Sequence, residues 1–162
     1  MQGATFRNSK LNFANFNYAK VSNSDFTNAD LTQGKIYRAN FYKAKMLNAL
    51  FTGADLQESN LENVVADYAD FVGANLNNAW LKGGFFLNAH FTNANLYCVN
   101  FTGANLTNVN FVNANLAKAN FNKANLTQAK LDKAMLDDAN LIGANLKDTE
   151  FKRAFLKDAK IK

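Results

Sequence analysis

The sequence has few of the residues that mark a redox, metal-binding or membrane protein. Its 162 residues include one cysteine, one histidine and no proline. The single cysteine, Cys98, excludes an internal disulfide framework, and the single histidine, His90, excludes a histidine-rich metal centre. No window approaches the run of about 18 apolar residues that a transmembrane helix needs. The N-terminal residues lack the charged and then apolar pattern of a secretory signal, so we predict a cytoplasmic location.

What is present instead is an internal repeat. The chain is 48% hydrophobic and 19% charged, which is typical of a folded protein, and its length suits a single domain over residues 1–162. From Phe6 to Ile161 every fifth residue is large and apolar, with Ala66 as the one exception. The residue two positions before each of these is small. The fold must therefore explain a period of five.

A period of five fits neither a helix nor a flat strand. Five residues turn an α-helix by about 500°, so the large residues would not form a stripe. On a strand, an odd spacing sends alternate residues to opposite faces. An extended three-residue piece, however, points the small and the large residue inward, and the other two residues turn the chain. The spacing therefore predicts a β-solenoid whose coils pair through their backbones.

The length of one coil follows from residues that recur at a period of 20. Leucine occupies one such series: Leu56, Leu76, Leu96, Leu116, Leu136 and Leu156. Residues of the same type stack on one another when each coil has four sides of five residues. The chain then forms about eight coils. The absence of proline agrees, because nearly every backbone N–H is needed by a neighbouring coil.

The five-residue units also resemble a known family. They include ADLQE, ANLNN, ANLTN and ANLKD, and this pattern is similar to the A(N/D)LXX signature of pentapeptide-repeat proteins over residues 4–162. The resemblance implies an all-β fold, a right-handed quadrilateral β-helix. It implies much less about activity, because one fold serves many functions.

Two local features leave alternatives open. Val64 and Ala66 exchange the usual sizes of the small and large positions, which we interpret as a compensated repacking in preference to a functional kink. Near the C-terminus, Phe151, Ala154, Phe155 and Ala159 keep the repeat but also have helical spacing, so a short capping helix is an alternative. Uncovered ends of a solenoid expose core residues and backbone groups, so self-association through the ends is a further hypothesis.

The sequence offers no chemistry for catalysis. His90 and Cys98 fall at outward positions without a neighbouring base, and Asp137 and Asp138 form an adjacent pair on a turn. No phosphate-binding glycine loop and no metal-spaced Cys/His set is present. We therefore predict a protein that is not an enzyme and that uses no metal or cofactor.

The positive charge gathers on the fourth side, which carries Val21 and Phe41. Its lysines are Lys20, Lys43, Lys82, Lys123, Lys160 and Lys162, against Glu62 alone. Such a side is most simply a solvated surface, but phosphate binding to nucleic acid or to a membrane surface is an alternative function. Some family members imitate DNA and protect type II topoisomerases. That alternative needs anionic rows along the rod, whereas here the acidic residues between Phe51 and Leu81 form a belt around it.

A group of apolar residues at outward positions predicts a contact surface. Its members are Leu47, Val65, Trp80, Phe85 and Leu87, with Trp80 one side before Phe85. Exposed aromatic patches often mark protein-binding sites. The sequence therefore predicts a non-enzymatic scaffold that binds a protein partner through its outer faces.

Overall fold

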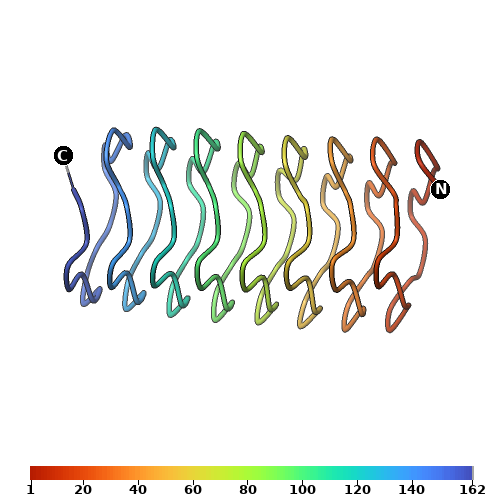
Figure 1. Ribbon diagram of the computed structural model, residues 1–162, viewed down its shortest axis with the longest axis horizontal. Helices are drawn as coiled ribbons and strands as arrows, with labels where there is room; N and C mark the ends of the chain where they lie inside the picture. Colours follow the sequence, from red (N-terminus) through yellow and green to blue (C-terminus); the bar gives the residue numbers. More distant parts are fainter. Residues whose placement is uncertain (162) are drawn as a thin grey trace.

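The protein is an elongated rod of stacked coils, described by a computed structural model over residues 1–161 (Figure 1). In the middle of each side, one residue forms a parallel bridge with the residue 20 positions later. We call these bridging residues the centre positions. They run in steps of 20 from Thr5 to Asn145 on the first side, Lys10 to Glu150 on the second, Asn15 to Phe155 on the third and Lys20 to Lys160 on the fourth.

These bridges are one residue long, and none belongs to a longer strand. Within residues 1–161 there is no helix, and so none long and apolar enough to cross a membrane. The predicted coil of 20 residues with four sides is confirmed by the bridges.

Every side ends in a turn of the same geometry. The small residue donates its N–H to the carbonyl of the preceding large residue, as Ala74 does to Phe71 at 3.0 Å. Two corner residues lie between them, and the second has a positive φ at every corner from Gly3 to Asp158. A hydrogen bond from the fourth residue to the first, with a positive φ at the third residue but not at the second, is typical of a type II turn. Asparagine is frequent at this second corner position because it tolerates the left-handed conformation.

Hydrogen bonds between coils, together with those inside the turns, use most of the backbone groups. The N–H of Leu96 donates to the carbonyl of Asn115 at 2.8 Å, and the N–H of Asn95 donates to Ala74 at 2.9 Å. The N–H of the first corner residue finds no backbone acceptor, and the centre position supplies one. Ala117, for example, donates its N–H to Oδ1 of Asn115 at 3.2 Å. This bond explains why Asn or Asp so often precedes the large residue.

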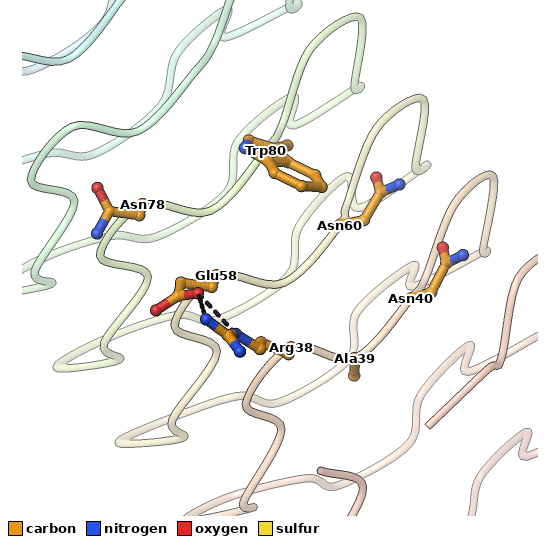
Figure 2. Close-up of a pocket in the computed structure, with 7 residues that line it drawn as sticks. All are labelled: Arg38, Ala39, Asn40, Glu58, Asn60, Asn78 and Trp80. Carbon is orange, nitrogen blue, oxygen red and sulfur yellow. Dashed lines mark hydrogen bonds and ion pairs between the residues drawn. The ribbon is translucent and has the colours of Figure 1, made fainter. Parts of the chain in front are cut away.

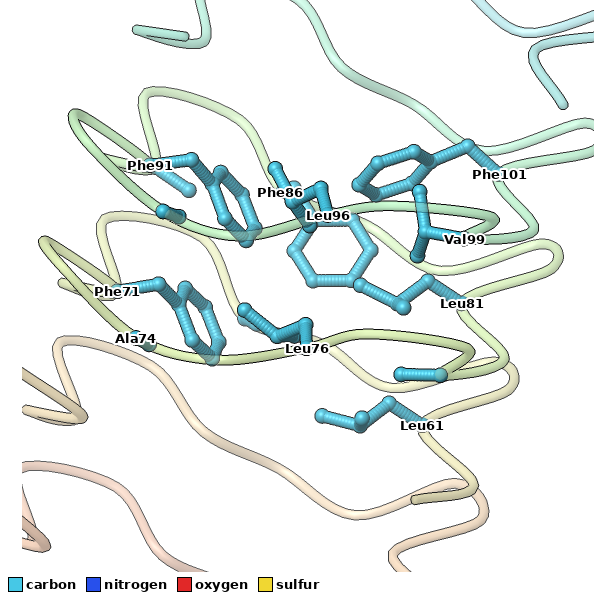
Figure 3. Packing of buried hydrophobic residues seen from close by; sticks show 14 of the residues in the cluster. Leu61, Phe71, Ala74, Leu76, Leu81, Phe86, Phe91, Leu96, Val99 and Phe101 are labelled. Carbon is cyan, nitrogen blue, oxygen red and sulfur yellow. The ribbon is translucent and has the colours of Figure 1, made fainter. Parts of the chain in front are cut away.

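The interior is filled by the large and small residues of all four sides (Figure 3). Phe71 and Phe91, one coil apart, stack with ring centroids 4.6 Å apart and planes 2° apart. Phe86 meets Phe91 edge-on at 5.8 Å. Val64 and Ala66 are both fully buried, so their exchange of sizes is accommodated inside the core.

The ends of the rod differ from its middle in burial. Large residues of the first and last coils, such as Phe6 and Leu156, are only partly buried. The alternative of a capping helix over residues 151–159 is wrong, because Phe155 occupies a centre position and bridges Met135 in parallel. The C-terminal residues keep the five-residue register because pairing with the coil before them satisfies their backbone groups. Self-association through the ends stays a prediction.

Candidate functional site

The centre positions separate side chains that serve the fold from side chains that do not. Asparagine fills every centre position from 95 to 125, and each Oδ1 accepts the N–H of the residue two positions later. Between residues 45 and 90, several centre positions hold side chains that do not make this bond: Lys45, Leu50, Val65, Trp80, Phe85 and His90. Places where a sequence departs from the rule of its own fold are candidates for function.

Four of the predicted contact residues lie together beside the first side. Val65 and Phe85 occupy neighbouring centre positions there and bridge each other. Leu47 and Leu87 occupy the first corner position next to them, two coils apart. Between these leucines, Asp67 accepts the N–H of Leu87 at Oδ1, at 2.8 Å. We call Leu47, Val65, Phe85 and Leu87 the apolar strip.

The apolar strip is accessible from outside the rod. Phe85 is 49% exposed, and the other three side chains are partly buried. The backbone beneath Phe85 is fixed by a bond from its N–H to the carbonyl of Val64 at 2.9 Å. The strip therefore presents apolar area on a rigid support, which suits contact with an apolar surface of another molecule.

Trp80, the fifth predicted contact residue, belongs to a different feature. It lies on the fourth side, one corner before Phe85, and it lines a hollow of about 620 Å³ (Figure 2). The indole is 52% exposed. The hollow is lined by Arg38, Ala39, Asn40, Glu58, Asn60, Asn78 and Trp80. It therefore spans three successive coils and combines one aromatic ring with amide and charged groups.

An ion pair fixes one wall of this hollow. Nε and Nη2 of Arg38 each lie 2.7 Å from Oε2 of Glu58. The hydroxyl of Tyr37 donates to Oε1 of the same carboxylate at 3.3 Å, and the Arg38 guanidinium lies 5.1 Å from the centre of the Tyr37 ring. The hydrogen bond to Glu58 raises the pKa of Arg38 above its ordinary value. The two opposite charges are thus held in one arrangement and cancel within the hollow.

Sequence reasoning found Trp80 but missed the residues around it. Arg38, Glu58 and Asn78 occupy the same second corner position in three successive coils. The period of 20 was the signal that could have found them, since it places these three residues in one column beside the centre position of Trp80. Their mixed chemistry made them look like ordinary corner residues.

The predicted basic residues do not form one continuous row. Lys20 and Lys160 occupy centre positions of the fourth side near opposite ends of the rod. The corner between the fourth and first sides carries Lys43, Lys82 and Lys123, and each of these lies two coils from the next. All five are exposed, and the Lys43 ammonium lies 5.2 Å from the centre of the Tyr42 ring. Lys162 lies outside the described residues.

The remaining reactive side chains stand apart from both features. His90 is exposed at a centre position of the second side, and Cys98 is partly buried at a corner. Over the part of the chain that the structure describes, no three His, Cys, Asp or Glu side chains are grouped so as to hold a metal ion. The apolar strip and the hollow are the two candidate sites of the rod.

Comparison with protein families identifies the repeat. A model described as a pentapeptide repeat region matches residues 35–111 and 85–161. A second model, of eight copies of the pentapeptide repeat, matches residues 1–33. A search of the curated proteins finds no match to this chain.

Solved structures with the same fold come from several sources. HetL, from the cyanobacterium Nostoc, is a pentapeptide repeat protein involved in regulating heterocyst differentiation. It is 25% identical to this chain, and the alignment covers 98% of this chain and 89% of HetL with a TM-score of 0.55. Rfr23, from the cyanobacterium Cyanothece, is 35% identical over 57% of this chain and 64% of its own, with a TM-score of 0.56. QnrB1 is a plasmid-mediated fluoroquinolone resistance protein. Its trypsin-treated form is 19% identical, the alignment covers 99% of this chain and 84% of QnrB1, and the TM-score is 0.59. The likeness to QnrB1 concerns the fold alone.

Proposed function

The chain belongs to the pentapeptide-repeat family, and we propose that it is a non-enzymatic scaffold that binds a protein partner through the apolar strip. One observation carries this proposal. Val65 and Phe85 stand side by side at centre positions, where asparagine would support the turn, and Phe85 is half exposed. Asp67 accepts the N–H of Leu87 in place of residue 85, so Phe85 takes no part in the turn. An aromatic ring that serves neither the turn nor the core and still meets solvent is explained by contact with another molecule.

The rod suits this role because it needs no rearrangement to bind. Hydrogen bonds to both neighbouring coils hold the backbone of each side, so a partner meets side chains at fixed spacing. A preorganised surface pays less entropy on association than a flexible one. HetL, which takes part in regulating heterocyst differentiation, shares this architecture, and a regulatory role is compatible with a scaffold that binds proteins.

Protein binding is favoured over DNA mimicry and over phosphate binding. A DNA mimic needs rows of negative charge along the rod, whereas the centre positions from 95 to 125 are all neutral asparagines. Phosphate binding needs lysines close enough to act together, and on the predicted basic side Lys43, Lys82 and Lys123 each lie two coils from the next.

We also propose that the coil is right-handed and that the protein acts in the cytoplasm. The right-handed sense is that of nearly all connections between parallel strands. A crystal structure tests the sense of the coil, and fractionation of cells from the native host tests the location.

A crosslinking experiment with matched positions tests the binding function. A photoreactive amino acid replaces Phe85 in one variant and Leu50 in the other, since Leu50 is also an exposed apolar residue at a centre position, but on the second side. We expect a specific protein adduct from position 85 only. With that partner purified, Phe85→Ser should raise the Kd about tenfold or more, while Leu50→Ser leaves it unchanged. An equal effect of the two substitutions would exclude the strip as the contact surface.

A further inference from the structure

We propose that the hollow beside Trp80 is a carbohydrate-binding site that takes a neutral oligosaccharide. The hollow lies on the fourth side and shares no residue with the apolar strip. The inference therefore stands independently of protein binding. It rests on the aromatic ring, on unused amide groups, on the balance of charge and on the shape of the hollow.

Trp80 breaks a structural pattern of its own side. Five asparagines occupy other centre positions of the fourth side and accept the N–H two residues later: Asn40, Asn60, Asn100, Asn120 and Asn140. Trp80 cannot make this bond, and the N–H of Lys82 has no acceptor within residues 1–161. The indole does not fill the core either, because half of it is exposed. The ring is thus a flat apolar platform, on which the C–H face of a sugar ring packs well.

Amide groups around the ring supply the hydrogen bonds that sugar hydroxyls need. Asn40 and Asn60 use Oδ1 to accept the turn N–H, at 3.0 and 2.9 Å, and leave the Nδ2 donors unused by any residue of the described chain. Within the same residues, neither the Asn78 amide nor the indole N–H of Trp80 has a partner. Hydroxyl groups both donate and accept, so they match a mixed set of amide donors and acceptors. Figure 2 shows these side chains around the hollow.

The charges of the hollow favour a neutral ligand. Arg38 and Glu58 bind each other at 2.7 Å, so neither charge is left over for an ion of opposite sign. The Glu58 carboxylate would repel an anionic ligand, and the Arg38 guanidinium would repel a cationic one. A neutral, polyhydroxylated molecule adds hydrogen bonds to both without either repulsion.

The shape of the hollow fits a short chain of sugars. Neighbouring coils lie about 4.8 Å apart, so the three coils that carry Arg38, Glu58 and Asn78 extend over about 10 Å. The volume of about 620 Å³ lies within the usual range for ligand sites. An extended peptide is less suitable, because the backbone groups of the side already pair between coils and offer no edge for strand addition.

Trp80 is the only tryptophan of the chain, so its fluorescence reports directly on this site. The probes are cellotetraose, maltotetraose and tri-N-acetylchitotriose, each titrated to about 10 mM so that millimolar affinity is detected. We expect a saturable change in Trp80 emission with one of them. Asn60→Ala should weaken that binding about fivefold through the lost amide donor. The matched control is Asn120→Ala, on the same side but outside the hollow. It removes the acceptor for the N–H of Asn122, as Asn60→Ala removes the acceptor for the N–H of Glu62, and it should leave sugar binding unchanged.

Two further measurements complete the test. Trp80→Ala should abolish binding in calorimetry, whereas Phe85→Ser should retain it, which separates this site from the apolar strip. The proposal is overturned if no probe gives a saturable change, or if Asn60→Ala and Asn120→Ala weaken binding equally. It is also overturned if Trp80 emission responds only to the protein partner, since the hollow would then be part of a protein interface.

Discussion

Two stretches of the rod share one backbone but differ in what their centre positions do. From 95 to 125 every centre position is asparagine, and each side chain supports the following turn. From 45 to 90 many of these positions hold apolar, aromatic or basic side chains instead, and the turns still form with the same positive φ. The turn therefore does not require the asparagine. The difference separates centre positions whose side chains support the turn from those whose side chains do not, and Val65, Trp80 and Phe85 belong to the second group.

Some asparagines at centre positions are also linked to one another. Within the regular stretch, Asn115 donates Nδ2 to Oδ1 of Asn95 at 3.2 Å, and Asn95 donates Nδ2 to Oδ1 of Asn75, one coil earlier, at 3.1 Å. The irregular stretch gives up such bonds at several positions, yet its core residues are as fully buried as those of the regular stretch. Stability along the rod should therefore depend first on the core, which the two stretches share, and only second on the centre positions, which they do not.

The largest expected effect tests whether the core is indeed the same in both stretches. Leu76 and Leu96 stack on each other and are fully buried, one in each stretch. Replacing either by aspartate buries a charge without a partner, which costs at least about 3 kcal/mol. We expect Leu76→Asp and Leu96→Asp to be equally damaging, with loss of the β spectrum in circular dichroism. Tolerance of only one of them would show that the cores differ and would break the comparison.

A smaller effect should come from the centre positions themselves. Asn110 and His90 bridge each other on the second side, and only Asn110 accepts a turn N–H, that of Val112, at 3.0 Å. Asn110→Ala should lower the free energy of unfolding by about 1 kcal/mol, or the melting temperature by about 2–4 °C. His90→Ala should change it by less than about 0.5 kcal/mol.

The reverse substitution sharpens this test. His90→Asn introduces an acceptor for the N–H of Thr92 and should stabilise the rod, whereas an unchanged melting temperature would mean that the asparagine bond adds nothing.

The fold could be predicted from the sequence because the five-residue register leaves only one geometry. A large residue such as Leu96 must stack on Leu116 once each coil has 20 residues, and their neighbours Asn95 and Asn115 do form a bridge. The role of asparagine could not be predicted in the same way. It depends on which backbone N–H lacks an acceptor, and that becomes evident only when the turn is known.

The candidate sites were predictable to different degrees. Phe85 and Val65 could be found because they are apolar at outward positions. The hollow around Trp80 was predictable only in part. The period of 20 places Arg38, Glu58 and Asn78 in one column, but the ion pair that shapes the hollow depends on the side-chain conformations of Arg38 and Glu58. The register fixes the backbone positions of Arg38 and Glu58, but it does not fix the conformations of their long side chains.

The last prediction concerns Asp25, a centre position where a carboxylate in place of the asparagine amide accepts the turn N–H. Oδ1 of Asp25 accepts the N–H of Thr27 at 2.9 Å, and Oδ2 pairs with Arg7 at 3.0 Å. Partial burial of the carboxyl opposes its ionisation, but the hydrogen bonds from Thr27 and Arg7 outweigh this and lower the pKa of Asp25 to about 2. The ionised form thus stabilises the fold above pH 3.8, and this contribution is lost as the pH falls through about 2.

Asp25→Asn should keep the turn bond and remove this dependence on pH. We expect the stability of the unmodified protein in urea to fall more steeply between pH 3.8 and about 2 than that of Asp25→Asn. The other carboxylates are common to both proteins, so the difference between the two curves isolates Asp25. Parallel curves would mean that Asp25 has the same pKa in the folded and unfolded chains. A difference would show that the first side holds a pH-dependent turn, whereas the asparagines from 95 to 125, which do not titrate, hold their turns at any pH.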